Sequence, residues 1–210
     1  ADVDVVVIAV KPQMASDVLR ALAGQCHDKL VISIMAGVEV ATISQLLGGA
    51  ERIVRVMPNT PALVQQGANG AYAANISEQD RALATQILQA TGLVCWVKQE
   101  QDIDAVTAVS GSGPAYFFYV MEHMIQAGKD LGLDAETATQ LTLQTALGAA
   151  QMAINSEHSP TQLRKNVTSP NGTTQAAIET FDAQNVGQGI EQGLAAAAKR
   201  SQELAEMLRN

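Results

Sequence analysis

The sequence predicts an α/β domain followed by an all-α domain. The first half of the 210-residue chain alternates apolar β-branched runs with segments of helical spacing, whereas the second half contains helical segments alone. Strands that alternate with helices are typical of a largely parallel sheet covered by helices. The chain is 47% hydrophobic but only 3% aromatic, so aliphatic side chains must form its core. We place the boundary so that residues 1–98 form the first domain and residues 99–210 the second.

The first half contains strands of the kind that are buried on both faces. Residues Val3–Val10 form a nearly unbroken β-branched run, and Lys11-Pro12 ends it. Gly24 and Gly48-Gly49 supply stop signals for two of the helices. We expect further strands at Leu30–Met35, Ile53–Met57, Gly67–Ala73 and Leu93–Val97, and helices at Met14–Leu22, Val40–Leu47 and Glu78–Thr91.

The second half is predicted to be helical throughout. Residues Asp102–Leu131 have helical spacing except at Ser110–Pro114, where two glycines and a proline predict a break or kink. Acidic residues in the first turn of Asp134–Asn155 suit the positive end of a helix dipole. Further helices are expected at Pro160–Val167, Thr174–Phe181 and Val186–Leu208.

Charge and hydropathy exclude several classes of partner. The net charge is −8 and the basic residues are scattered, which argues against nucleic acid or an anionic membrane as the main partner. No apolar run approaches the ~20 residues of a membrane span, and no signal-peptide pattern is present. The acids Glu100, Asp102 and Asp104 indicate a solvated helix start.

The cysteines and histidines indicate neither a disulfide nor a metal site. Cys26 and Cys95 lie far apart and outside any Cys-x-x-Cys pattern, so we expect buried free thiols and a cytoplasmic location. The spacing of His27, His123 and His158 suits no zinc site. We therefore predict no bound metal.

Three predicted strands end in segments that could admit a flat ligand. In a parallel sheet, ligands bind beyond the carboxyl ends of the strands. Val10–Pro12, Met35–Gly37 and Met57–Pro61 all occupy such positions. Any one of them could be an ordinary strand exit, but three in succession favour a cofactor groove. The G-x-G-x-x-G fingerprint is not found, and Gly111–Gly113 is no substitute because it follows a helical pattern.

The segment Arg164–Thr174 predicts an anion site. It combines a basic pair, hydroxyls and a Pro-Asn-Gly turn directly ahead of a helix-forming stretch, Gln175–Glu179. A turn followed by a threonine N-cap would explain the same residues as helix punctuation. A helix N-terminus alone stabilises an exposed anion by roughly 0.3–1 kcal/mol, so a substrate site would need several convergent donors.

Four segments together resemble the pyrroline-5-carboxylate reductase family, and they occur in the family's order: Ala9–Gln13, Met57–Pro61, Ala105–Tyr116 and Val167–Thr174. The resemblance implies a Rossmann-type nucleotide-binding domain followed by a helical substrate-binding and dimerisation domain. It also implies the last step of proline biosynthesis, in which an oxidoreductase acting on a CH–NH group reduces a cyclic imine with NADPH, or possibly NADH. Homodimers, and decamers of them, are implied as the assembly.

The resemblance starts in the middle of the Rossmann-type domain. The chain enters its first buried-type strand within a few residues of Ala1, which by itself suggests a fragment. The resemblance implies that the first strand and the glycine-rich loop are missing. Asn171 stands where many relatives carry glycine, and asparagine tolerates the same left-handed backbone.

Site residues carry over from the family by position. The resemblance gives Thr174 as the catalytic residue, which would orient the imine nitrogen or relay a proton from water, since an alcohol is too weak an acid to be a strong proton donor. Glu100 is a weaker candidate near the substrate. The implied substrate-binding residues are Ser110, Gly111, Ser112, Gly113, Glu157, Ser169, Gly172, Thr173 and Thr174. The implied cofactor-binding residues are Ala9, Val10, Lys11, Pro12, Ile34, Met35, Ala36 and Asn166.

Two alternatives remain open on the sequence. The chain could be a catalytically inactive dimeric fragment of such a reductase, because the glycine-rich loop is not present. It could also be a two-domain dehydrogenase acting on a hydroxy acid, which would place a catalytic lysine on a helix of the second domain. Lys129 and Lys165 are the lysines there before the final helix, and neither lies in a Gly-x-x-x-Lys segment.

Overall fold

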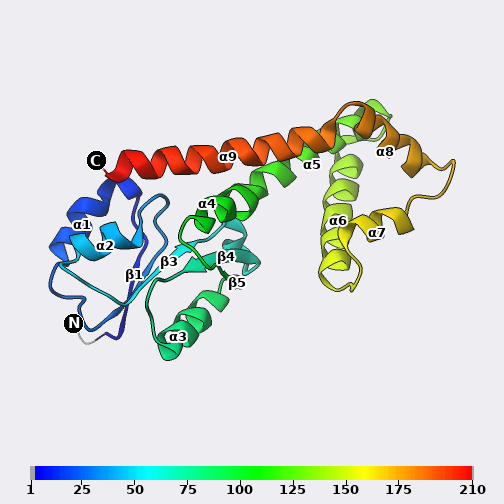
Figure 1. Ribbon diagram of the computed structural model, residues 1–210. Coiled ribbons are helices and arrows are strands. Elements are labelled where there is room, and N and C mark those ends of the chain that lie inside the picture. Colours follow the sequence, from blue (N-terminus) through cyan, green and yellow to red (C-terminus); the bar gives the residue numbers. More distant parts are fainter. Residues whose placement is uncertain (1–2, 210) are drawn as a thin grey trace. The chain divides into compact units, whose positions relative to one another are not determined.

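The computed structural model describes residues 3–209 and divides into two compact units. The first unit contains the residues up to Pro114 together with those from Leu194 onward, and the second contains Ala115–Gly193. A five-stranded sheet occupies the first unit, whereas the second unit is helical (Figure 1). The predicted α/β plus all-α fold class is confirmed.

The sheet is mixed, with strand order β1-β2-β3-β4-β5. The strands β1, β2 and β3 are mutually parallel, β4 is antiparallel to β3, and β5 is parallel to β4. The reversal follows from the short connection at residues 58–66, because a parallel crossover needs a dozen or more residues. The strands are β1 (Val5–Ile8), β2 (Leu30–Ser33), β3 (Ile53–Met57), β4 (Gly67–Tyr72) and β5 (Gly92–Trp96).

Helices cover both faces of the sheet, as the apolar strands predicted. The helices α1 (Ala15–Ala21) and α2 (Val40–Leu46) lie over one face, and α3 (Glu78–Gln89) lies over the other (Figure 1). Alternate strand residues therefore enter different cores. Val31 and Ile53 pack in the α1 and α2 core, together with Ile8, Leu19, Ile43 and Leu47. The α3 core contains Leu30, Ile32, Val54, Val56, Ala84 and Leu88.

Small residues in β4 allow a helix to lie directly against the sheet. A Cβ added to Gly70 would overlap the side chain of Val106, which belongs to α4 (Asp102–Val106). Gly92, at the start of β5, has φ +146, and a Cβ there would overlap the Gly67 backbone. The glycine-rich composition of β4 thus reflects close backbone packing.

The predicted break or kink at Ser110–Pro114 takes the form of a π-turn, and the helical run is nearly continuous through it, so the helix is perturbed there but does not end. A π-turn at Thr107–Gly111 follows α4, Ser112 intervenes, and α5 (Gly113–Asp130) begins at once. The Ser112 N–H donates to the Thr107 carbonyl at 2.8 Å. A π-turn adds one residue to the helical ladder, and such turns are frequent at functional sites. It accommodates the glycines and the proline without ending the helix.

The second unit consists of helices, and side chains cap the starts of two of them. The Asp134 carboxylate accepts from the Thr137 N–H at the start of α6, and Ser159 accepts from Gln162 N–H at the start of α7. Gly128 of α5 lies close to α6, since a Cβ there would be 3.2 Å from that of Ala138. The helices after α5 are α6 (Ala135–Ile154), α7 (Pro160–Asn166), α8 (Thr173–Ala183) and α9 (Val186–Arg209), of which α9 continues into the first unit.

Many large apolar side chains of the second unit are exposed. They lie on α5, α6 and the segments that follow, and include Phe117, Phe118, Tyr119, Leu131, Leu141, Leu147, Met152 and Ile154. Exposed apolar patches of this kind mark interaction surfaces. None of the helices formed by residues 3–209 has the length and apolar character of a membrane span. Cys26 and Cys95 are both free thiols as predicted, but only Cys26 is buried and Cys95 is exposed.

An ion pair joins the start of β3 to α3. The Arg52 Nε donates to the Asp80 Oδ2 at 3.0 Å, a second guanidinium nitrogen donates to Oδ1, and Nη1 donates to the Asp28 carbonyl at 2.6 Å. Asp80 is buried. The hydrogen bonds from Arg52 hold the pKa of the Asp80 carboxyl below its usual range.

The replacement Asp80→Asn should lower the free energy of unfolding at pH 7 by about 1–3 kcal/mol, because it removes one partner of a charged hydrogen-bonded pair. The pKa of Asp80 is lower in the folded than in the unfolded chain. Its stabilisation is therefore complete above an unfolded-state pKa of about 4 and is lost as the pH falls through the folded-state pKa. Urea unfolding at pH 7 and at pH 3 measures both effects.

The variant Glu51→Gln is the control, because Glu51 is an exposed neighbour of Arg52. It should leave both unfolding curves unchanged. An Asp80→Asn penalty of the same size at pH 3 as at pH 7 would contradict the assignment.

Candidate active site

The predicted cofactor segments of the first unit leave the same edge of the sheet. In the parallel pair β1 and β2, Ile8 lies opposite Ser33, and the Ile34 N–H donates to the Ile8 carbonyl at 3.0 Å. Residues 9–12 and 34–36 are consequently adjacent. The Met57–Pro61 segment follows β3, which is parallel to β2, and so begins at this edge too.

The exposure of these segments differs from residue to residue. Ala9, Lys11 and Ala36 are exposed, whereas Val10, Pro12 and Ile34 are half-buried and Met35 is buried. The Met35 N–H lies 3.4 Å from the Ser33 hydroxyl, which accepts from it. Small exposed residues beside a lysine leave the backbone at these strand ends open to a flat, anionic ligand.

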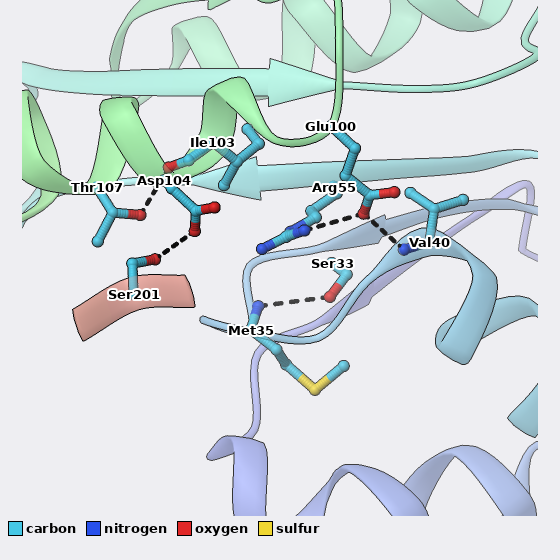
Figure 2. A network of polar contacts seen from close by, with 9 residues as sticks. All are labelled: Ser33, Met35, Val40, Arg55, Glu100, Ile103, Asp104, Thr107 and Ser201. Carbon is cyan, nitrogen blue, oxygen red and sulfur yellow. Dashed lines mark hydrogen bonds and ion pairs between the residues drawn. The ribbon is translucent and has the colours of Figure 1, made fainter. Parts of the chain in front are cut away.

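Glu100, Asp102 and Asp104 all accept hydrogen bonds within the protein, which corrects the prediction of a merely solvated helix start. The Glu100 Oε1 accepts from the Val40 N–H at 2.8 Å and from the Arg55 Nη1 at 2.9 Å (Figure 2). The Asp104 carboxylate accepts from the Ser201 hydroxyl of α9 at 2.7 Å, and that of Asp102 accepts from the Gln99 N–H at 3.0 Å.

Glu100 forms an ion pair with Arg55, whose side chain is buried. The Arg55 side chain is 5% exposed and that of Glu100 is 22% exposed. The carboxylate of Glu100 thus accepts from a buried cation and from the first turn of α2, which begins a few residues after the Ile34–Ala36 segment (Figure 2). These two hydrogen bonds hold Glu100 in the segment that connects β5 to α4.

The predicted substrate residues Ser110–Gly113 lie at the π-turn of the first unit. Ser110, Gly111 and Ser112 are half-buried and Gly113 is buried. The Ser110 hydroxyl donates to the Val106 carbonyl at 3.1 Å, while the Ser110 carbonyl accepts from the Asn59 Nδ2, also at 3.1 Å. The π-turn therefore contacts the Met57–Pro61 segment, so two of the four family-like segments lie together.

The predicted anion loop of the second unit ends at a helix start without a side-chain cap. The N-cap of α8 is Gly172, and no side chain caps it, so the alternative of a threonine N-cap is wrong. The Gly172 N–H donates to the Ser169 carbonyl at 3.0 Å. Asn171 has φ 60, which confirms the left-handed backbone expected for it. Thr173 and Thr174 occupy the first turn of α8, where backbone N–H groups lack intrahelical partners.

Most of the remaining predicted residues of the second unit are exposed. Asn166 is the last residue of α7, and its Oδ1 accepts from the Gln162 Nε2 at 2.8 Å. Glu157 lies in the connection between α6 and α7 and is exposed. Ser169 and Thr173 are exposed, and Thr174 is half-buried. The predicted substrate residues are therefore divided between the two units, with Ser110–Gly113 in the first.

Comparison with known proteins identifies the family. Residues 100–204 match the family model of pyrroline-5-carboxylate reductase dimerisation, and residues 1–37 match that of NADP oxidoreductase, coenzyme F420-dependent. The pyrroline-5-carboxylate reductase of Pseudomonas aeruginosa is 55% identical over 210 residues, which cover 99% of this chain and 77% of that protein. The chain belongs to the pyrroline-5-carboxylate reductase family.

Solved structures of the reductase family have the same fold. The pyrroline-5-carboxylate reductase of Coxiella burnetii has a TM-score of 0.90 at 45% identity, over 97% of this chain and 76% of that one. The pyrroline carboxylate reductase of Plasmodium falciparum, solved with NADP bound, has a TM-score of 0.88 at 33% identity, over 96% of this chain and 77% of that one. The match over residues 1–37 contains both strand-end segments predicted to bind a cofactor.

Two polar residues of the first unit were not recognised from the sequence as parts of a site. Arg55 lies inside an apolar strand, and its partner Glu100 is 45 residues away. Asn59 was included in a family-like segment without a role. The sequence feature that could have indicated a role for a residue such as Asn59 is Pro114. A proline has no N–H to donate to the Ser110 carbonyl, so another donor is needed there.

Proposed function

We propose that the protein reduces 1-pyrroline-5-carboxylate to L-proline with a hydride from NADPH, the last step of proline biosynthesis, with NADH as a second possible donor. The observation that carries the proposal is the 55% identity to a pyrroline-5-carboxylate reductase over 99% of the chain. The NADP bound to the Plasmodium falciparum relative supports the choice of cofactor. The protein is then an oxidoreductase acting on a CH–NH group.

We assign the cofactor to residues 1–98, as the nucleotide-binding domain, and the substrate to residues 99–210. Ala9, Val10, Lys11 and Pro12 would contact the cofactor together with Ile34, Met35 and Ala36, because these segments leave adjacent parallel strands. Asn166 would contact it from the helical domain. The cofactor supplies the hydride, and the protein supplies position and electrostatics.

The start of α8 is the proposed site of the substrate carboxylate. Gly172 leaves the N-terminal N–H groups without a side-chain cap, and Ser169, Thr173 and Thr174 add hydroxyl donors within a few residues. A helix end alone contributes only about 0.3–1 kcal/mol to binding of an anion, so these convergent donors are needed. Ser110–Gly113 and Glu157 are proposed as further substrate-binding residues.

Thr174 is the proposed catalytic residue. Reduction of the imine places a hydride on its carbon, and the nitrogen must gain or already carry a proton. A hydroxyl is too weak an acid to be a strong donor at neutral pH, so Thr174 would hydrogen-bond the nitrogen and orient the ring, or pass on a proton from water. Its half-buried place in the first turn of α8 is compatible with such a contact.

We further propose a homodimer formed through the helical domain, with decamers as a possible higher assembly, and a cytoplasmic location. The exposed apolar side chains of the second unit support an interface, as does the match to the dimerisation model at residues 100–204. Two free thiols suit a reducing compartment.

Oxidation of NADPH by the protein with 1-pyrroline-5-carboxylate, followed by its absorbance, tests the reaction. We expect proline as the product, and no oxidation of NADPH with an oxo acid, the substrate that a hydroxy-acid dehydrogenase would reduce. A folded dimer that neither turns over nor binds NADPH in a calorimetric titration would instead support the inactive-scaffold alternative.

The replacement Thr174→Ala should lower kcat about tenfold or more, the effect of losing one hydrogen bond of roughly 1.5 kcal/mol to a charged or reacting group. Thr180→Ala is the matched control on the same helix, because the Thr180 hydroxyl donates only to the local Ala176 carbonyl, at 2.9 Å. The control should keep the parent kcat, and circular dichroism should show both variants folded. An unchanged kcat in Thr174→Ala would remove Thr174 from the mechanism.

A further inference from the structure

At the π-turn, the Ser110 carbonyl needs a hydrogen-bond donor from outside the helix. In an α-helix, the Ser110 carbonyl would accept from the N–H of residue 114, but Pro114 has none. The Asn59 Nδ2 donates to this carbonyl at 3.1 Å. A side chain from the loop after β3 thus supplies the interaction that the helical ladder cannot.

Asn59 is itself fixed in orientation. Its Oδ1 accepts from the Ala68 N–H, at the start of β4, at 2.8 Å. An amide has one accepting and one donating end, so an N–H on one side and a carbonyl on the other determine how it points. The half-buried Asn59 side chain therefore links the β3 loop, β4 and the π-turn.

The groups next to Ser110 depend on where that carbonyl is held. The Ser110 hydroxyl bonds back to Val106 and the Ser112 N–H bonds back to Thr107, so neither of these groups anchors the turn to the sheet. Gly111 lies against the end of β3, directly before this loop, since a Cβ there would be 2.6 Å from the Met57 Cε. A shift of Asn59 would move the backbone of Ser110–Gly113 as a unit.

We propose that Asn59 is a positioning residue that holds Ser110–Gly113 in the geometry needed to bind the substrate. This inference rests on the proposed function only in taking Ser110–Gly113 as a wall of the substrate pocket. Asn59 acts through the Ser110 carbonyl and is assigned no contact with substrate or cofactor. Its replacement should therefore weaken the binding of the cyclic imine more than the binding of NADPH.

The test compares Asn59→Asp with Asn69→Asp in the full protein. The carboxylate introduced by Asn59→Asp would still accept from the Ala68 N–H but could not donate to the Ser110 carbonyl. Asn69 is a matched control, because it is buried and its Nδ2 donates to the Leu93 carbonyl and to the Thr91 hydroxyl, both at 3.1 Å and both outside the π-turn. Asn59→Ala is a second variant, which removes both interactions without adding a charge.

We expect Asn59→Asp to raise KM for 1-pyrroline-5-carboxylate about tenfold, the scale of one lost hydrogen bond. The Kd for NADPH should change much less than this KM. Asn69→Asp should lower stability and leave both constants unchanged. If the KM of both Asn59 variants rises no more than that of Asn69→Asp, the role of Asn59 is merely structural and the proposal is overturned.

Amide hydrogen exchange of residues 110–116 provides a readout that does not need activity. These amides should exchange faster in Asn59→Asp and Asn59→Ala than in the parent, and at the parent rate in Asn69→Asp. Unchanged exchange in the Asn59 variants would overturn the positioning role even in an active enzyme. A parent protein without turnover would refute the proposed function, whereas the exchange rates would still decide whether Asn59 holds the turn.

Discussion

A buried arginine in the middle of the sheet constrains the first unit of this protein. Arg55 lies on β3, opposite Ser33 of β2 on one side and Tyr72 of β4 on the other. An unpaired buried charge costs several kcal/mol, so the chain must bring a carboxylate to it. Glu100 meets this requirement with one oxygen, which also accepts from the first turn of α2. The pair thus connects β3, the first turn of α2 and the segment that leads into α4.

The segments of the first unit that form the candidate site are positioned by the interactions of Arg55 and Glu100. The Val40 N–H bound by Glu100 follows the Ile34–Ala36 segment by a few residues, so the loop between β2 and α2 is held at both ends. Glu100 also leads directly into α4, and Asp104 of α4 accepts from Ser201 of α9. The π-turn that follows α4 is then tied to the loop after β3 through Asn59. Charge pairing and side-chain amides, rather than apolar packing alone, determine where the backbone of the site lies.

The sequence predicted the elements well where local physics decides them. The strand Ile53–Met57 was predicted with both of its ends, because a β-branched run followed by proline has few other conformations. The residues 9–12 and 34–36 could be placed at one edge because neighbouring parallel strands end together. The left-handed backbone of Asn171 followed from the family-like turn. Each of these inferences needs only residues close together in the chain.

Other features depend on partners far away in the sequence and could not be predicted. Glu100 was interpreted as solvated because nothing near it identifies Arg55 as its partner. The form of the break or kink predicted at Ser110–Pro114 could not be given, because the compensating donor, Asn59, lies 51 residues earlier. Glycine and proline show where a helix is perturbed, and the surrounding structure decides how.

A double-mutant cycle on Arg55 and Glu100 tests the central constraint most directly. Arg55→Met and Glu100→Gln should each lower the free energy of unfolding by about 3–5 kcal/mol, and the double variant should lose much less than the sum, because no buried charge is then left unpaired. The exposed pair Arg200 and Glu203 is the control, with an expected coupling of about 0.5 kcal/mol or less. Additive effects of the Arg55 and Glu100 replacements, measured at fixed protein concentration, would contradict the account.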